Sequence, residues 1–333
     1  MQQAVEQAPR LLQKFSQKLF SHSSEQAQFI EALMQPRAFH PCILWLDAKL
    51  EPFPFAVEPP LDWQPDFVDR LALDAKPGRH PLHQQGAFYC LDFSSVFAAS
   101  VLLQIQQPIK TLVDMCAAPG GKSIFAWKAL QPKLLISNEV IGKRLGALTS
   151  NLKRCRVHPC VTTTLDSSVL ATEIAATADL VIVDAPCTGQ SLLAKGEKNP
   201  GCFHPVNINK NANRQKRILA NSAQVVAPQG FLAYMTCAYS PEENEQVLEW
   251  LLQKFPHFQP VAAPHLSAYQ SHLTHLPGYR MFPQTGLGAG AFAVLLQNTA
   301  PLHSPESSVE ENQQKLAKLL EHPKVRLINA MNP

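Results

Sequence analysis

The stretch TLVDMCAAPGGKS at residues 111–123 decides the fold of this chain. Thr111 to Val113 form a short β-branched and apolar run that ends in Asp114, as expected of a buried strand, and small residues follow at once. The segment after Gly121 continues as a helix. A strand, a small-residue turn and a helix bring backbone N–H groups close to a ligand, so residues 115–122 predict a loop that holds a nucleotide-like cofactor.

The spacing within this loop narrows the choice of cofactor. A phosphate-cradling loop needs glycine five positions before its Gly-Lys-Ser, where this sequence has Cys116. The dinucleotide pattern Gly-x-Gly-x-x-Gly is not present here either. Both features argue against a nucleoside triphosphate or a dinucleotide. A purely structural tight turn is the alternative, and it explains the glycines but not the whole string from Cys116 to Lys122.

Strand-like runs alternate with helical stretches from about residue 109 onwards. This alternation predicts an α/β fold with a parallel sheet, whose ligands bind at the carboxyl ends of the strands. An apolar run at 291–297 follows a glycine-rich turn and is expected to close the sheet as an antiparallel strand. The expected parallel strands are residues 111–114, 134–138, 160–164, 179–184 and 230–236.

The N-terminal third has a different composition. Residues 1–35 show helical periodicity and predict two short helices, whereas residues 36–81 contain nine prolines, which favour turns and edge strands. We therefore expect a small mixed α+β accessory region at 1–100. The main α/β domain is expected at 101–298, followed by a polar tail at 299–333.

Composition limits the class of protein. The chain has 333 residues, 46% hydrophobic and 17% charged, with a net charge of +3, which is typical of a globular protein that tolerates an anionic partner. The sequence has neither an apolar run of ~18 residues nor an N-terminal signal peptide, so we expect a soluble, cytoplasmic protein without membrane contact. Its eight cysteines lack a Cys-x-x-Cys pattern, and its histidines lack companion ligands, so no metal is expected.

Three further stretches accompany the loop DMCAAPGGKS at 114–123: HPLHQQGAFYCLDFSSVFAA at 80–99, DLVIVDAPCTG at 179–189 and YMTCAYSPEENE at 234–245. Together they resemble the RsmB/Sun/Nop family of S-adenosylmethionine-dependent RNA cytosine-C5 methyltransferases. The resemblance implies a Rossmann-like class I methyltransferase sheet, S-adenosyl-L-methionine as cofactor and ribosomal or transfer RNA as partner. We expect the enzyme to act as a monomer.

The resemblance also assigns cofactor contacts. Glu139, about 20 residues after the glycine loop, suits hydrogen bonds to ribose hydroxyls, although it could instead cap a helix. Asp166 matches the position that faces the adenine amino group, with a solvated loop aspartate as the alternative. The full expected set is Cys116, Ala117, Ala118, Pro119, Gly120, Gly121, Lys122, Glu139, Arg144, Asp166 and Asp184.

Two cysteines carry the expected chemistry. C5 of cytosine is too electron-poor to accept a methyl group until a nucleophile adds at C6, which requires a thiolate. Cys187 and Cys237 each follow a strand run, and by resemblance Cys237 attacks C6 while Cys187 assists release of the product. Asp184 is expected to bind the N3 and amino edge of cytosine as a carboxyl kept protonated by burial. Buried, inert thiols are the alternative.

A basic segment follows the Cys187 motif and predicts a phosphate-binding surface, with Glu197 as the one acid within it. A second basic group at 143–156 is equally well explained as a solvated helix face. Two rival functions remain open: a methyltransferase of the same fold acting on another nucleophile, and a catalytically silent RNA-binding scaffold. The basic residues expected to bind RNA are Lys195, Lys198, Lys210, Arg214, Lys216 and Arg217.

Overall fold

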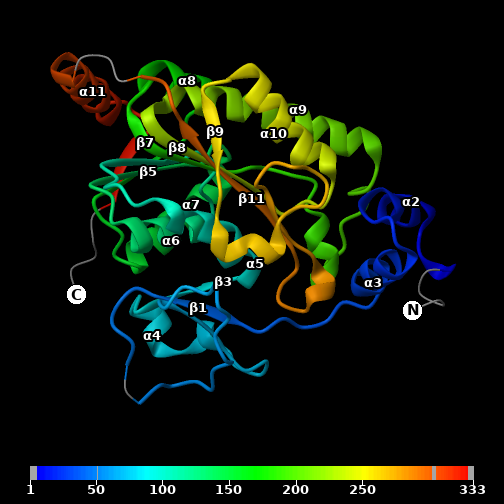
Figure 1. Cartoon of the computed structure of the whole chain (residues 1–333). Coiled ribbons are helices and arrows are strands. Elements are labelled where there is room, and N and C mark those ends of the chain that lie inside the picture. The colour runs from blue at the N-terminus through cyan, green and yellow to red at the C-terminus, as the bar shows by residue number, and fades with distance from the viewer. Residues whose placement is uncertain (1–5, 51, 302–304, 329–333) are drawn as a thin grey trace.

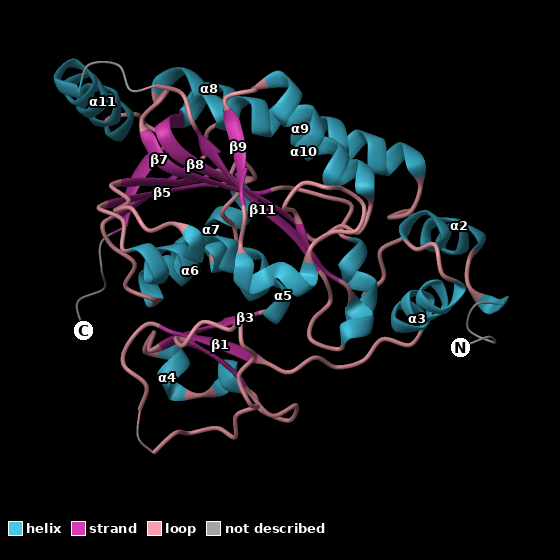
Figure 2. Cartoon of the chain, in the orientation of Figure 1, coloured by secondary structure: helices cyan, strands magenta, loops and turns pink. Residues whose placement is uncertain are grey.

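The computed structural model describes residues 6–50, 52–301 and 305–328, and its centre is a sheet with helices on both faces (Figures 1 and 2). Five parallel strands form the middle of this sheet in the order β8-β7-β4-β5-β6. The α/β parallel sheet predicted from the sequence is thereby confirmed. The strands are β4 (Thr111–Asp114), β5 (Leu134–Asn138), β6 (Cys160–Thr163), β7 (Ala178–Asp184) and β8 (Val226–Thr236).

Antiparallel strands extend both edges. β11 (Ala291–Asn298) pairs with β8, as the sequence predicted, and it also pairs with β10 (Tyr279–Met281) and β9 (Phe258–Val261). At the other edge, β12 (Val325–Ile328) pairs with β6. The sequence did not predict β12, because three of its four side chains are not buried and the segment therefore lacks an apolar pattern.

Alternate residues of each parallel strand enter two separate cores. In β7, Leu180 and Ile182 belong to one core and Val181 and Val183 to the other, and all four are fully buried. A sheet covered on both faces needs this continuous apolar run. One face is covered by α5 (Phe93–Ala99), α6 (Gly121–Leu130) and α7 (Gly142–Arg154), and the other by α8 (Ser167–Glu173), α9 (Pro205–Val225) and α10 (Glu245–Lys254), with α11 (Pro305–Leu320) beside α8.

The strand order changes direction at β4, which has β5 on one side and β7 on the other. Chain connections leave the carboxyl ends of these strands in opposite directions, so a crevice opens between the loops that follow β4 and β7. The loop after β4 is the small-residue stretch at 115–120, and the loop after β7 carries Cys187. The fold therefore brings two of the predicted motifs to one place.

A small antiparallel sheet packs against the helices α6 and α7. Arg154 donates a hydrogen bond of 2.6 Å to the carbonyl of His83, and its guanidinium lies 5.6 Å from the ring centre of Tyr89. This arginine of the second basic group therefore joins two parts of the fold. The small sheet consists of β1 (Cys42–Trp45), β2 (Val68–Arg70) and β3 (Phe88–Leu91), with α4 (Pro81–Gln84) preceding β3.

The first two described helices, α2 (Arg10–Leu19) and α3 (Ser23–Met34), lie apart from the small sheet (Figure 1). They form a core of their own with residues of the large domain. Phe29 of α3 packs edge-on against Tyr239, with ring centres 5.2 Å apart. Residues before 100 therefore contact the large domain at two separate places, and one of these is the loop that carries Cys237.

The strand cores make a direct prediction about stability. Replacing Ile182 by alanine removes a fully buried side chain from the central strand β7. We expect the free energy of unfolding to fall by ~2–5 kcal/mol, because a cavity remains where the side chain was. Urea denaturation measures this loss. Leu327→Ala, at a side chain that is 65% exposed, is the control and should change the free energy by less than ~0.5 kcal/mol.

Candidate functional site

A buried aspartate, Asp114, fixes the loop after β4. Asp114 accepts a hydrogen bond of 2.6 Å from the Ser123 hydroxyl and one of 3.3 Å from the backbone N–H of Cys116. Gly120 has φ +112°, and a Cβ atom on Gly121 would lie 2.6 Å from a methyl carbon of Leu91. Burial raises the pKa of Asp114 to about 7, and the nearby Asp184 carboxylate acts in the same direction. Gly120 therefore needs the conformational freedom of glycine, whereas a side chain at Gly121 would require the Leu91 side chain to move.

A cavity of about 320 Å³ opens above this loop. It holds five of the residues that the sequence predicted to bind cofactor: Cys116, Ala118, Glu139, Arg144 and Asp184. Both cysteines of the predicted reaction, Cys187 and Cys237, also line it. The other six predicted contacts do not line the cavity: Ala117, Pro119, Gly120, Gly121, Lys122 and Asp166.

Glu139 presents a buried carboxylate oxygen to this cavity. Its Oε1 accepts a hydrogen bond of 2.8 Å from the N–H of Ile141. Its Oε2 lies 3.2 Å from Nη1 of Arg144 but without hydrogen-bond geometry, so among the described residues this oxygen has no hydrogen-bond donor. A buried acceptor without a donor is costly, and the hydroxyls of a ribose would supply one. These residues therefore fit the nucleoside part of S-adenosylmethionine.

Asp166 has a structural task in the described chain. It is the N-cap of α8 and accepts hydrogen bonds from the N–H and the hydroxyl of Ser168, at 3.0 and 2.8 Å. These bonds, led by that of the Ser168 N–H, lower the pKa of Asp166. A contact between Asp166 and the adenine amino group stays a prediction.

The two thiols lie side by side. The Sγ atoms of Cys187 and Cys237 are 3.1 Å apart. This proximity follows from the sheet, because each cysteine comes shortly after one of two paired parallel strands, with Asp184 of β7 opposite Met235 of β8. The sequence placed both thiols at strand ends, and the register brings them together.

The surroundings of the two sulfurs differ in charge. A hydrogen bond from Cys187 is the main cause that lowers the pKa of Cys237, with further contributions from the Ser191 side chain and the Lys122 ammonium. The pKa of Cys187 is raised by the same hydrogen bond, by burial and by the carboxylate of Glu243. Cys237 is therefore the more acidic of the two thiols. This is the order that the predicted roles require.

Lys122 points toward Cys237, away from the cofactor cavity. Its ammonium lies 2.7 Å from Oδ2 of Asp184, and both residues are close to Cys237. Burial lowers the pKa of Lys122, but the attraction of Asp184 outweighs it and the net shift is upward. The Asp184 side chain is 32% exposed and forms an ion pair with Lys122, so the expected burial is not found, and its contact with the cytosine edge stays a prediction. The protonated group beside the thiols is Lys122.

A second small cavity, of about 50 Å³, begins at Cys237 and contains Lys122. Asp92, Ser94 and Ser191 line it, together with Gly290 from the loop before β11. Cys237 is thus the residue shared by this cavity and the cofactor cavity. A pyrimidine ring in this second cavity would lie on one side of the Cys237 sulfur, with the other residues of the cofactor cavity on its far side.

Glu243 also belongs to the site. It lies within the motif at 234–245, but the sequence alone assigned it no role. It is fully buried and joins the Cys187 loop to the segment after Cys237. Its carboxylate accepts bonds from the N–H and hydroxyl of Thr188, at 2.8 and 2.6 Å, and from the hydroxyl of Ser240 at 2.6 Å. Gln215 of α9 donates a fourth bond of 3.1 Å. Four donors around one carboxylate fix the position of both loops.

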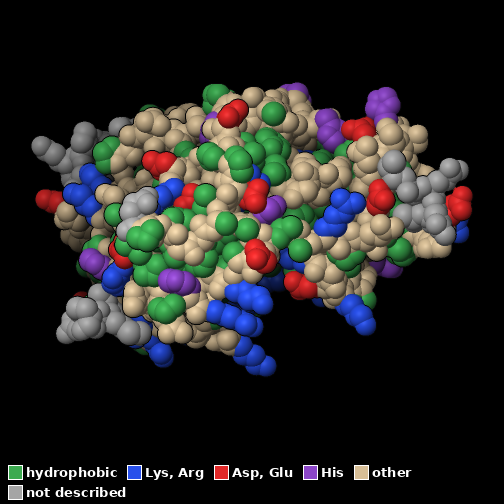
Figure 3. All heavy atoms as spheres, turned by 90° about the horizontal axis from the view of Figure 1, so that it is seen from below, with side chains coloured by type: hydrophobic (Ala, Val, Ile, Leu, Met, Phe, Trp, Pro, Cys, Tyr) green, Lys and Arg blue, Asp and Glu red, His purple; other side chains and the backbone are tan. Residues whose placement is uncertain are grey.

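The basic segment does not form one surface. Lys195 pairs with Asp92 at 2.7 Å and Arg217 with Asp166 at 3.5 Å, whereas Arg214 lines the cofactor cavity. Lys216 lies over the ring of Trp250, and Lys198 and Lys210 are exposed. Figure 3, which views the molecule from below, shows the Lys and Arg side chains of that face in several separate groups. RNA binding by this segment stays a prediction, with Lys198 and Lys210 as its most accessible members.

The described residues contain neither a candidate metal site nor a candidate membrane-spanning helix. No group of three or more His, Cys, Asp or Glu side chains in them is arranged to hold a metal ion. None of the helices in residues 6–50, 52–301 and 305–328 is both long and apolar enough to cross a membrane.

A sheet of this order, with a glycine loop after its first parallel strand, an acidic residue after its second and an antiparallel strand β11 beside β8, is typical of class I S-adenosylmethionine-dependent methyltransferases. Residues 101–297 match the model of the 16S rRNA methyltransferase RsmB/F family. The chain therefore belongs to this family, and the resemblance found in the sequence is confirmed.

Similar proteins agree with this assignment. The chain is 28% identical to Ribosomal RNA small subunit methyltransferase F of Cronobacter sakazakii, over 79% of this chain and 56% of that protein. It spans about half the length of the curated relatives it matches. Two structures from Pyrococcus horikoshii share the fold. A methyltransferase homolog protein has 21% identity and a TM-score of 0.72, covering 90% of this chain and 99% of that one. NSun6 has 18% identity and a TM-score of 0.67, covering 88% and 99%.

The charge asymmetry between the thiols predicts a pH dependence. Lys122→Met removes the positive charge beside Cys237 and leaves Asp184 unpaired, and both changes disfavour the thiolate. We expect the pKa of Cys237 to rise by roughly one unit, so that its alkylation at neutral pH becomes slower. The rate of iodoacetamide labelling of Cys237, followed by peptide mass spectrometry against pH, measures the midpoint. Lys143→Met on the exposed face of α7 is the control, and an unshifted midpoint in Lys122→Met would contradict this account.

The Glu243 network predicts a loss that its amide variant partly restores. Glu243→Ala leaves the buried Thr188 N–H without an acceptor and the Gln215 amide with the Pro186 carbonyl alone, which should cost ~1–3 kcal/mol of stability and reduce methyl transfer. Glu243→Gln keeps one acceptor oxygen, and the two hydroxyls are free to reverse their bonds. It should therefore lie between the wild type and Glu243→Ala in thermal unfolding and in activity. Glu321→Ala, at an exposed glutamate, is the control, and equal behaviour of all three variants would refute the network's role.

Proposed function

We propose that this chain transfers a methyl group from S-adenosylmethionine to C5 of a cytosine in ribosomal RNA. One observation carries the proposal: two thiols 3.1 Å apart, of which the one beside Lys122 is poised to be a thiolate, where the cofactor cavity meets a second cavity. Cytosine-C5 methylation needs a thiolate at this place. Membership of the RsmB/F family and the 28% identity to a methyltransferase of small-subunit ribosomal RNA support this substrate.

The residues of this site divide the reaction into steps. The Cys237 thiolate forms a bond to C6, and the electron pair of the C5–C6 bond moves into the ring toward N3 and O2. Lys122, held by Asp184, donates a hydrogen bond to the ring edge where this negative charge develops. S-adenosylmethionine would supply an electrophilic methyl group: the electron pair held in the ring would form the C5–methyl bond, and the electron pair of the broken methyl–sulfur bond would stay on the cofactor sulfur.

Release of the product restores the aromatic ring. The proton on C5 leaves to a base, and the electron pair of that C–H bond reforms the C5–C6 double bond as the S–C6 bond breaks. Cys187 lies 3.1 Å from the leaving sulfur, and we assign it the role of assisting this step. The base then holds the C5 proton, and the Cys237 thiolate is regenerated for another cycle.

We also propose the division of labour along the chain. Residues 101–298 carry the chemistry, while residues 1–100 and the exposed part of the basic segment select the RNA, with 299–333 as a C-terminal extension. A monomeric enzyme is part of this proposal. A ribosomal RNA substrate supports a cytoplasmic location.

The two thiols predict opposite behaviours of their variants. Cys187→Ala should accumulate a covalent protein–RNA complex, because addition proceeds while release is impaired. Cys237→Ala should form no complex and transfer no tritium from labelled cofactor to RNA. Gel shifts in denaturing detergent measure the complex, and Cys202→Ala at a buried cysteine outside the two cavities is the control. A complex formed by Cys237→Ala would overturn the assignment.

The rival functions make different predictions in the same assays. A silent RNA-binding scaffold would retain RNA but transfer no tritium. If the enzyme methylates another nucleophile, the Cys237→Ala variant should transfer as much tritium as the wild type. Bisulfite sequencing of RNA from cells with and without the protein distinguishes ribosomal from transfer RNA and identifies the cytidine.

A further inference from the structure

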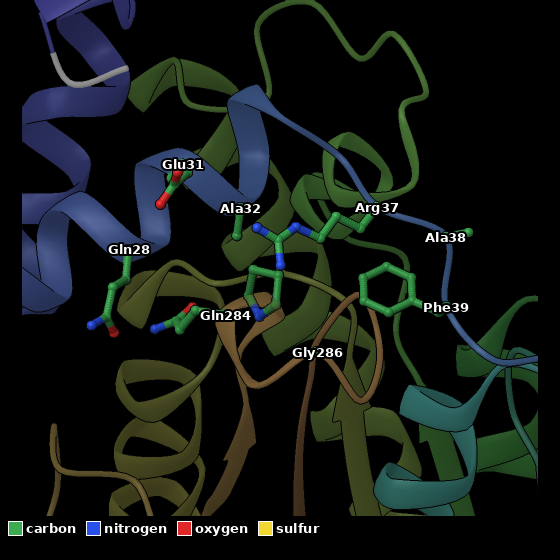
Figure 4. Close-up of a pocket in the computed structure, with 9 residues that line it drawn as sticks. Gln28, Glu31, Ala32, Arg37, Ala38, Phe39, Gln284 and Gly286 are labelled. Atoms are coloured by element: carbon green, nitrogen blue, oxygen red, sulfur yellow. The ribbon is translucent and has the colours of Figure 1, made fainter. Parts of the chain in front are cut away.

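A separate cavity of about 370 Å³ lies beneath α3 (Figure 4). Neither the cofactor cavity nor the cavity at Cys237 includes any of its residues. Its volume falls within the range of ligand sites, ~300–1,000 Å³. It is lined by Gln28, Glu31 and Ala32 of α3, by Arg37, Ala38 and Phe39, and by Pro283, Gln284 and Gly286 from the loop between β10 and β11.

Planar groups dominate the wall of this cavity. Figure 4 shows the guanidinium of Arg37 and the ring of Phe39 directed into it, with the amide side chains of Gln28 and Gln284 at its other end. The Oε1 atom of Gln284 is buried and has no hydrogen-bond partner among the described residues. An aromatic ring, a guanidinium plane and amides that both donate and accept are the groups that bind an unstacked nucleobase.

The cavity adjoins the site of the reaction through two loops. A Cβ atom on Gly196 would lie 3.5 Å from Pro36, the neighbour of Arg37, and the preceding Lys195 lines the cavity at Cys237. Gly286 lines the cavity beneath α3, and Gly290 lines the one at Cys237. Four residues span at most roughly 14 Å, so a few nucleotides of one strand bridge the two cavities.

Aromatic packing fixes the cavity relative to the nucleophile. Phe29 of α3 and Phe282, which precedes Pro283, pack on Tyr239 from two sides, with ring centres 5.2 and 6.2 Å away. Tyr239 is two residues after Cys237, and its hydroxyl donates a hydrogen bond to the carbonyl of Ala289. Both walls of the cavity are therefore anchored to the loop that holds the attacking sulfur.

We propose that this cavity binds a nucleobase of the substrate RNA that lies a few nucleotides from the target cytidine in the same strand. Phe39 stacks on the base, Arg37 donates to its acceptors or to the adjoining phosphate, and Gln284 accepts from an amino or imino group. The inference rests on the proposed RNA substrate and deepens it. It assigns target selection partly to α3 and the segment after it.

Photo-crosslinking tests this subsite on the full chain. The probe is a short oligouridine with one central cytidine and 4-thiouridine at each flanking position in turn. We expect one flanking position to crosslink to the peptide that contains Arg37 and Phe39 or to the one that contains Gln284. Phe39→Ala and Arg37→Ala should each weaken RNA binding about fivefold or more, as loss of one stacked base does, while binding of S-adenosylhomocysteine is unchanged.

Leu73→Ala, at an exposed leucine of the N-terminal part, is the control and should bind the probe like the wild type. Crosslinks confined to peptides around Cys237 and Gly290, with unchanged affinity of Phe39→Ala and Arg37→Ala, would overturn the subsite and leave the RNA substrate intact. A wild-type chain that neither crosslinks to RNA nor methylates it would instead overturn the proposed function. Because Arg37 is exposed, its variant keeps the test valid if Phe39→Ala fails to fold.

Discussion

The buried carboxylate of Glu243 is the constraint on which the site depends. It accepts hydrogen bonds from the loop after β7 and from the segment after β8, and thereby joins the two loops that carry the thiols. The parallel register of β7 and β8 brings the loops to the same height. The Gln190 side chain and the Ser191 N–H add hydrogen bonds to the backbone of Cys237, Tyr239 and Ser240, so these bonds together with Glu243 hold the sulfurs in contact. The contact in turn makes one thiol more acidic than the other.

The chemistry follows from the unequal surroundings of two identical groups. Lys122 and Ser191 lie beside Cys237, and Glu243 lies beside Cys187, so one thiol is made acidic and the other is kept protonated. The Lys122 ammonium favours the Cys237 thiolate while the Asp184 carboxylate opposes it, and in the proposed reaction Lys122 lies where the ring becomes anionic. The same network that positions the loops therefore also separates the roles of nucleophile and helper.

Much of this fold could be predicted from local sequence. The five parallel strands are apolar on both faces, and the Cys116–Lys122 loop has a composition that only a ligand-binding turn explains. What could not be predicted depends on distant partners. Lys122 was expected near the cofactor but turns to Asp184, 62 positions away. Lys195 was expected to bind phosphate but pairs with Asp92, and β12 owes its strand conformation to the edge of β6. Ion pairs and edge pairing leave no periodic pattern in a sequence.

The central claim is that the sulfur of Cys237, and not that of Cys187, bonds to C6 of cytosine. RNA substituted with 5-fluorocytosine tests it most directly, because fluorine at C5 cannot leave as a proton does and the methylated adduct persists. Mass spectrometry of the digested wild-type complex should find the methylated fluoropyrimidine on the peptide that contains Cys237. The same adduct on the Cys187 peptide, or methylated RNA without any protein adduct, would contradict the account.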